Sequence, residues 1–259
     1  MKTEFPERRV GRPTTPEIDK FQSMAWFNTI AHSLGTNSPS KLEKLIQPKN
    51  VTKRTDGKTV PYGAWKEYKK GRLPRDGMMS DGDPGAVVAA GKHVSESLAI
   101  YRHKIWDVMR NERITFDDAL LLINSFDPFV KRFYFDLEEP TLSRKLDSFV
   151  EYFCQPIWIS REDDLIRSLD HLAIQLTILR IKRYWQGEHR YYSIVDNITK
   201  TLGPISVSAW IGPFHESFFD WIEKHMWNDL FDRYYEHENI GLRGWRKSRW
   251  EWIWPSYHF

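Results

Sequence analysis

The sequence has little cysteine and no long apolar run. Its 259 residues include a single cysteine, Cys154, which excludes an internal disulfide framework and favours a reducing compartment. No stretch approaches the length of a membrane span, and the first residues lack the apolar core of a signal peptide. These absences predict a cytoplasmic protein that does not enter a membrane.

The common catalytic and cofactor motifs are also missing. There is no Gly-x-Ser-x-Gly elbow and no dinucleotide fingerprint. Gly57-Lys58-Thr59 matches the end of a phosphate loop, but Thr52 stands where the loop needs its first glycine. Cys154 has no evident cationic neighbour to activate it, so we interpret it as a buried, inert thiol. The sequence therefore predicts no catalytic residue and no cofactor.

Aromatic residues, in contrast, are abundant, with 12 Trp, 11 Tyr and 15 Phe. Basic residues are concentrated towards the N-terminus. Residues 1–113 hold 21 Lys and Arg against 13 Asp and Glu, and residues 114–259 hold 17 against 22. Residues 41–75 alone carry 11 basic and 3 acidic side chains. Such a block on an otherwise slightly acidic chain indicates a surface that meets a polyanion, although solvated basic faces are also common.

Hydrophobic periodicity predicts an all-α fold in three parts. Residues 1–14 are charged and contain two prolines, and we interpret them as a flexible basic arm. Residues 15–84 form a small basic helical module, and a Gly- and Asp-rich break ends it near Gly85. Residues 85–259 form a larger, irregular helical bundle with a Trp-rich C-terminal tail.

The module is expected to contain three helices. The first carries apolar residues from Ile18 to Leu34 and ends at Gly35. Ser38-Pro39 opens the second, whose inward-facing residues are expected to be Leu42, Leu45 and Ile46. A polar connection, residues 49–59, leads to the third.

The third helix, residues 62–70, combines aromatic and basic side chains. Trp65 and Tyr68 are three residues apart and share one side, while Lys66 and Lys70 form a neighbouring stripe. Gly71 stands at the position that commonly ends a helix. An aromatic anchor beside a row of cations suits a helix that lies against a phosphate backbone. We expect Trp65 to be the structural pin of this helix.

The order of helices in residues 20–75, with Trp65, Tyr68, Gly71 and Pro74 at its end, resembles the helix-turn-helix domain of lambda-repressor/Cro-type regulators. The resemblance implies a DNA-binding module with regulatory function. The loop of residues 47–60 departs from the family, because it is too long for a tight turn between two paired helices. A charged helical surface or a protein-binding module remains an alternative for these residues.

Beyond Gly85 the pattern is helical almost throughout. Apolar residues from Val87 to Met109 predict one long helix, and Thr115 with Asp118 caps the next. A further helix has its core leucines at positions 165, 169, 172, 176 and 179. The last long helix is expected over residues 213–238.

That last helix carries a stripe of four groups that bind metals in other proteins, His225, Asp229, Asp232 and Glu236. A metal-dependent hydrolase is therefore one alternative. A polar stripe is, however, what any surface helix shows, and no second histidine has the spacing of zinc motifs. We interpret the stripe as solvent-exposed and predict no metal site.

The tail offers another alternative, a protein-binding adaptor or scaffold. Its tryptophans would form a large apolar surface that must be covered, either by the bundle or by a partner chain or second copy. The residues in question are Trp245, Trp250, Trp252 and Trp254.

Our main hypothesis is a bacterial regulatory protein that binds nucleic acid through the basic module, with DNA as the first candidate and RNA as the alternative. The bundle would then serve oligomerisation or ligand sensing. The residues expected to contact nucleic acid are Lys53, Arg54, Tyr62, Lys66, Lys69, Lys70, Arg72 and Arg75.

Overall fold

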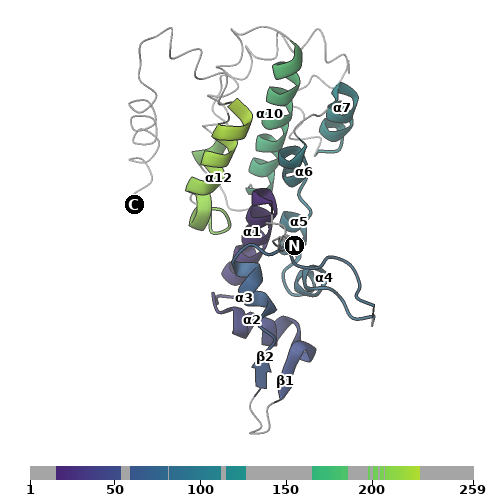
Figure 1. The fold of residues 1–259 in the computed structure, drawn as a ribbon, viewed down its shortest axis with the longest axis vertical. Coiled ribbons are helices and arrows are strands. Elements are labelled where there is room, and N and C mark those ends of the chain that lie inside the picture. Colours follow the sequence, from purple (N-terminus) through teal and green to yellow (C-terminus); the bar gives the residue numbers. More distant parts are fainter. Residues whose placement is uncertain are drawn as a thin grey trace, which may run out of the picture.

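The computed structural model describes residues 16–53, 59–80, 82–111, 115–126, 165–185, 198, 201–203, 205–206 and 208–227. In this part of the chain all regular elements are helical except one short hairpin, which confirms the predicted helical class. Figure 1 shows α1 in the middle of an elongated body. Helices α10 and α12 lie above it in this view, and α2, α3 and the hairpin lie below.

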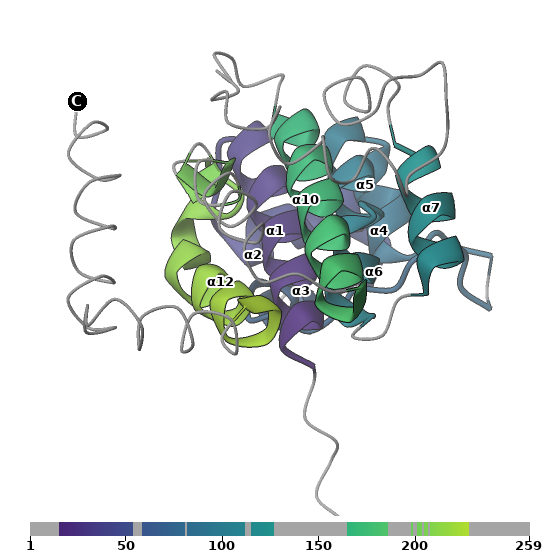
Figure 2. The ribbon, with the colours of Figure 1, turned by 90° about the horizontal axis from the view of Figure 1, so that it is seen from above.

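Helix α1, Glu17–Ser33, is the element that both halves share. Most of its residues from Ile18 to Ala31 are buried, because neighbours cover it on several sides. Figure 2, seen from above, shows α1 surrounded by the other helices. Gly35 follows the helix with φ +61°, which is the left-handed conformation expected of a residue that ends a helix. The predicted first helix is confirmed.

Four short elements and α3 make up the lower end. Helix α2 spans Pro39–Ile46, and the 3-10 turn η1 spans Pro48–Asn50. Strand β1, Val51–Lys53, pairs in antiparallel fashion with β2, Thr59–Pro61. The polar connection is thus partly a hairpin, in which Thr52 lies opposite Val60. Helix α3, Ala64–Lys69, follows directly.

One of the three inward-facing residues predicted for α2 is wrong. Leu42 and Ile46 are buried as expected, but Leu45 is 51% exposed. Glu43 is buried in its place, with 1% of its surface exposed. The reason is that α2 turns its Glu43 side towards the start of α3, where backbone N–H groups need an acceptor.

The predicted long helix over residues 87–109 is also wrong. The chain forms three short helices there, α4 (Ala86–Gly91), α5 (Ser95–Tyr101) and α6 (Ile105–Arg110). Apolar residues keep helical spacing across both breaks, so the pattern does not reveal them. At the break between α5 and α6, His103 Nδ1 accepts a local hydrogen bond of 3.1 Å from Ile105 N, and His103 Nε2 lies 3.0 Å from Asp170 Oδ1 on α10.

The upper half is built on α10. Helix α7, Phe116–Asn124, begins as expected with Thr115 Oγ1 accepting from Asp118 N at 3.1 Å. Helix α10, Leu165–Trp185, confirms the predicted leucine helix. The chain then returns through η4, Gly212–Phe214, into α12, His215–Ile222. A π-helical segment, η5, Glu223–Trp227, continues it within the predicted last helix.

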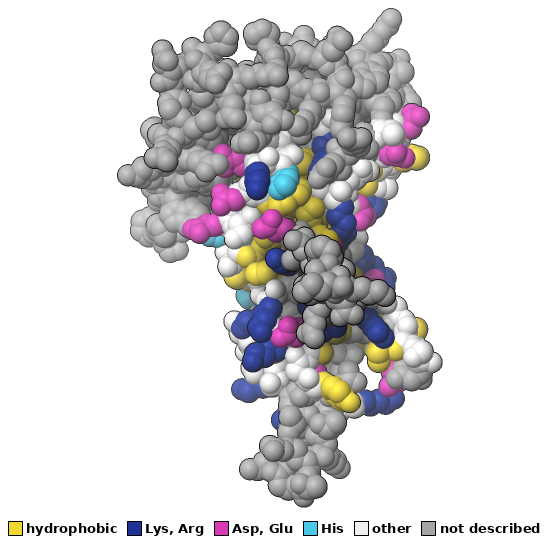
Figure 3. All heavy atoms as spheres, viewed as in Figure 1, with side chains coloured by type: hydrophobic (Ala, Val, Ile, Leu, Met, Phe, Trp, Pro, Cys, Tyr) yellow, Lys and Arg dark blue, Asp and Glu magenta, His cyan; other side chains and the backbone are white. Residues whose placement is uncertain are grey.

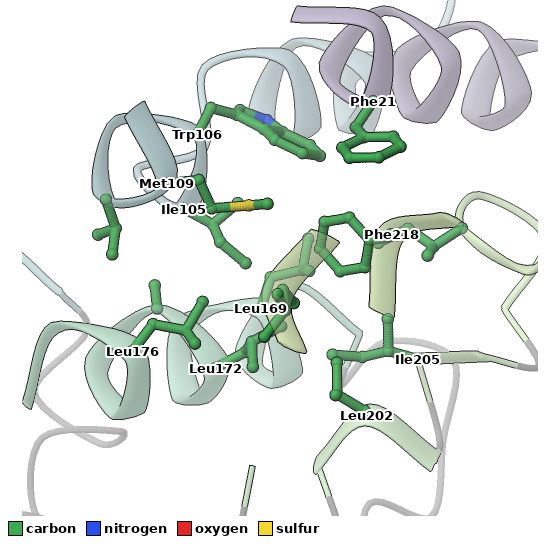
Figure 4. Packing of buried hydrophobic residues seen from close by; sticks show 14 of the residues in the cluster. Phe21, Ile105, Trp106, Met109, Leu169, Leu172, Leu176, Leu202, Ile205 and Phe218 are labelled. Carbon is green, nitrogen blue, oxygen red and sulfur yellow. The ribbon is translucent and has the colours of Figure 1, made fainter. Parts of the chain in front are cut away.

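The buried side chains form two clusters that meet at α1. The upper cluster joins α1, α6, α10 and α12, and Figure 4 shows Phe21, Trp106, Leu169 and Phe218 pointing towards one another. The lower cluster joins α1, α2, α3, α4 and α5. Helices α4 and α5 thus complete the core of the lower half, although they follow the break near Gly85. Packing among the described residues is continuous across the predicted boundary.

Candidate nucleic-acid interface

Helix α3 is held by a buried tryptophan and a buried carboxylate. The Trp65 side chain has no exposed surface, and its indole Nε1 donates to Gln47 Oε1 at 3.0 Å. At the start of the helix, Gly63 N donates to Glu43 Oε2 at 3.1 Å. Because both contacts reach back to the end of α2, α3 has one fixed position on the core. Trp65 is therefore the structural pin that the sequence predicts.

The end of α3 is fixed on α1. Ser23 Oγ lies 3.0 Å from Tyr68 O and 2.7 Å from Arg72 O. Between these two carbonyls, Gly71 has φ +97° and is buried against α1. These contacts place the turn after α3 on the first two turns of α1, so the cations on both sides of Gly71 stand on a rigid support.

The segment that follows is equally well held. Tyr101 Oη donates to Pro74 O at 2.9 Å, and Val87 N donates to Arg75 O at 3.1 Å. Asp76 accepts two hydrogen bonds from Arg102, of 2.8 and 2.9 Å. The guanidinium of Arg102 lowers the pKa of Asp76 through these bonds, although partial burial opposes the shift. Residues 72–76 thus form an ordered edge beside α3.

Three of the predicted contact residues are exposed cations on α3 and the segment that follows it. They are Lys66, Arg72 and Arg75, and none of them forms an ion pair with a residue that the structure describes. Tyr62, just before α3, is 74% exposed, and its phenol ring is open to a ligand. All four side chains are exposed, as an external contact requires.

Lys69 and Lys70 have neighbours of their own. Lys69 Nζ donates to Asn37 O at 3.2 Å and lies 5.8 Å from the centre of the Phe27 ring. Lys70 Nζ, just after α3, lies 3.2 Å from Oε1 of Glu67 in the last turn of the helix. Both ammonium groups remain exposed, and an exposed pair of this kind is worth less than about 1 kcal/mol. A phosphate can therefore compete with Glu67 for Lys70.

The remaining two predicted residues belong to the hairpin. The backbone of Lys53 lies in β1, and its side chain is outside the described residues, as is all of Arg54. Their part in the interface stays a prediction.

The charges of Arg72 and Arg75 act on the phenol of Tyr68. Burial raises the pKa of its phenol, while the positive charges of Arg72 and Arg75 oppose that shift and the carboxylate of Glu43 adds to it. The Tyr68 ring itself is partly buried against the lower cluster. Figure 3 shows dark blue Lys and Arg side chains gathered over the lower half of this face, where Figure 1 places α2 and α3. The described carboxylates, in magenta, lie mostly higher.

The sequence did not indicate the residues that position this surface. Ser23, Glu43 and Gln47 are polar side chains whose partners are 18 or more positions away in the chain, so no local pattern reveals them. The helix-turn-helix resemblance predicts a tight turn, whereas η1 and the hairpin separate α2 from α3. That resemblance stays a prediction.

The described residues give no support to the other candidate sites. His225 stacks on Trp221 with ring centres 4.6 Å apart, and the three acidic members of its stripe lie outside the described residues. Within the described ranges, no three His, Cys, Asp or Glu side chains come together as metal ligands would. The tail tryptophans, the basic arm and Cys154 also lie outside the described residues.

Comparison of the chain with protein families, with curated proteins and with solved structures finds no match. Among the helices of the described residues, none combines the length and apolar character that a membrane crossing requires.

Proposed function

We propose that this protein binds nucleic acid through the surface around α3, which we call the α3 face: Lys66, Lys69, Lys70, Arg72, Arg75 and the exposed ring of Tyr62. The observation that carries the proposal is the placement of Lys66, Arg72 and Arg75. All three are exposed on a rigid support and without a carboxylate partner among the described residues.

The geometry of the face suits phosphate groups. Lys66 lies in α3 and Lys70 is the residue that ends it, four positions on, so their stems are separated by about 6 Å along the helix axis. The arginines continue the row beyond the helix, and guanidinium groups bind phosphate oxygens through two donors at once. A ligand with regularly spaced negative charges can therefore meet several of these cations at the same time.

DNA is the ligand that we propose first, because residues 20–75 resemble a class of DNA-binding regulators. The contacts named here are phosphate contacts, which fix position and do not read sequence. Tyr62 is the one candidate for a base or sugar contact, since aromatic rings stack on exposed bases.

The test is a titration of the full chain against a fluorescein-labelled, mixed-sequence duplex at several salt concentrations, followed by anisotropy. Each phosphate contact contributes about 0.9 to the slope of log K against log salt. Lys66→Ala with Lys70→Ala should therefore lower this slope by about 2 and weaken binding to every sequence equally.

Two further variants sharpen the result. Glu67→Gln removes the partner of Lys70 and should strengthen binding. Lys224→Ala removes an exposed lysine in η5, in the other half of the molecule, and should leave the slope unchanged. If the wild-type chain does not bind, or binds with no dependence on salt, the proposal is wrong. A labelled RNA hairpin and a single strand of the same sequence, titrated in parallel, decide the class of nucleic acid.

A further inference from the structure

Helix α1 approaches the turn after α3 more closely than an ordinary side-chain contact would allow. A methyl group placed on Gly71 would lie 2.7 Å from Lys20 Cβ and 2.9 Å from both Cα and Cγ of Lys20. Gly71 therefore lies directly against the Lys20 stem. The two residues are 51 positions apart in the sequence, and their contact is a product of the fold.

The contact has a fixed geometry because a second one lies one turn further along α1. Ser23 Oγ bridges the carbonyl groups of Tyr68 and Arg72, on either side of Gly71. Residues i and i+3 of a helix share a face, so Lys20 and Ser23 present one surface to the turn. The Lys20 stem is consequently packed on Gly71, the residue between Lys70 and Arg72 in the sequence.

The charge on Lys20 is available for a ligand. Its side chain is exposed, and it forms no ion pair with a residue that the structure describes. The neighbouring acid on α1, Asp19, accepts two hydrogen bonds from Arg110, of 2.8 and 2.9 Å. Glu17, three residues before Lys20, is exposed and is the one described carboxylate on the same stretch of α1 besides Asp19.

We propose that Lys20 binds the same phosphate backbone as the α3 face, and that Lys20, Lys70 and Arg72 form one phosphate-binding cluster around the Gly71 turn. This inference rests on the proposed function. It extends the contact surface from α3 onto α1, so that α1 helps to position the protein on the nucleic acid. The cluster recognises the nucleic-acid backbone and adds affinity without sequence preference.

The test is the salt titration of the full chain with Lys20→Gln. Glutamine keeps the Cβ and Cγ atoms that pack on Gly71 and removes the charge. We expect the slope of log K against log salt to fall by about 0.9. The affinity should fall by the same factor for each of several unrelated duplex sequences. Lys20→Arg should keep the wild-type slope, and Lys224→Gln is the matched control in η5.

Two failures are distinguishable. If the wild-type chain binds no duplex, the proposed function fails and this inference with it. If the wild-type chain binds and Lys66→Ala with Lys70→Ala lowers the slope, but Lys20→Gln behaves like Lys224→Gln, only the inference is wrong. Thermal unfolding of each variant by circular dichroism excludes a loss of fold as the cause, because a binding defect with an unchanged Tm supports the proposal.

Discussion

The indole rings of Trp26 and Trp65 lie with their centres 5.3 Å apart, tilted by 36°, and neither residue has any exposed surface. The two rings differ in one respect. Trp65 Nε1 donates to Gln47, whereas Trp26 Nε1 is buried and has no hydrogen-bond partner among the described residues. The pair joins α1 to α3 through apolar contact, and only Trp65 adds a polar bond to it.

This difference predicts unequal costs for the same substitution. Trp65→Phe and Trp26→Phe both remove volume from the core, but only Trp65→Phe breaks a hydrogen bond and leaves Gln47 Oε1 without its donor. We expect Trp65→Phe to lower the free energy of unfolding by about 1 kcal/mol more than Trp26→Phe. Urea unfolding followed by circular dichroism measures both. Equal losses would show that the Gln47 bond contributes nothing.

Glu43 predicts a pH dependence of stability. Burial raises the pKa of its carboxyl above the ordinary value of 4.5, although hydrogen bonds from Gly63 N and Ala64 N oppose the shift. A carboxyl with a raised pKa in the folded state binds its proton more tightly there. Its contribution to stability is therefore present at low pH and lost as the pH rises through the folded-state pKa.

Two substitutions separate charge from hydrogen bonding at this position. Glu43→Gln keeps an acceptor for Gly63 N and should gain stability relative to the wild type as the pH rises from 4 to 7. Glu43→Ala removes the acceptor and should lose about 1–3 kcal/mol at every pH. The measurement is urea unfolding across this range, and a constant difference between wild type and Glu43→Gln would contradict the raised pKa.

His171 on α10 predicts the opposite pH dependence. Burial lowers its pKa from 6.5 to about 4, although the nearby Asp170 carboxylate opposes the shift. The folded protein therefore holds the neutral ring. Its contribution is present above about pH 6.5 and is lost as the pH falls towards 4, with a full effect of about 3 kcal/mol.

His171→Gln should remove this loss, so the variant should fall less in stability than the wild type between pH 7 and pH 4.5. His93→Gln, at an exposed position after α4, is the control. Unfolding in urea at the two pH values gives the comparison, and an NMR titration of the His171 ring checks its cause. A ring that titrates near pH 6.5 in the folded protein would refute the prediction.

Part of the fold could be predicted from the sequence because some signals are local. The spacing of apolar residues in α1 and α10 and the glycine that ends α3 are signals within a few turns, and the inward side of Trp65 follows from its place in a short helix, although its partners Gln47 and Trp26 are distant in the sequence. The breaks between α4, α5 and α6 could not, because apolar spacing runs across them, and the contact that holds His103 between α5 and α6 is with Asp170, 67 positions away.

The candidate site also contains residues that the sequence predicts and one that only the fold reveals. The cations of residues 66–75 are close in sequence, and their exposure follows from the buried side of α3. Lys20 is far from them in sequence, and nothing in its own neighbourhood on α1 marks it as different from an ordinary surface lysine. Only the packing of Gly71 against α1 brings it to the cluster. A pattern of charge along the chain therefore underestimates a surface that two distant helices build together.

The last prediction uses two glycines that differ in their surroundings. Gly35 and Gly71 both have positive φ, of 61° and 97°, but a methyl group on Gly35 would meet nothing within 4 Å. Gly35→Ala should therefore cost only the backbone strain, about 1 kcal/mol. Gly71→Ala adds a collision with Lys20, including the α1 backbone at Cα, so α1 and the turn must separate. We expect it to cost about 3 kcal/mol and to weaken the bond from Ser23 to Arg72 O. Thermal and urea unfolding measure both variants, and equal costs would mean that the turn after α3 does not rest on α1 in solution.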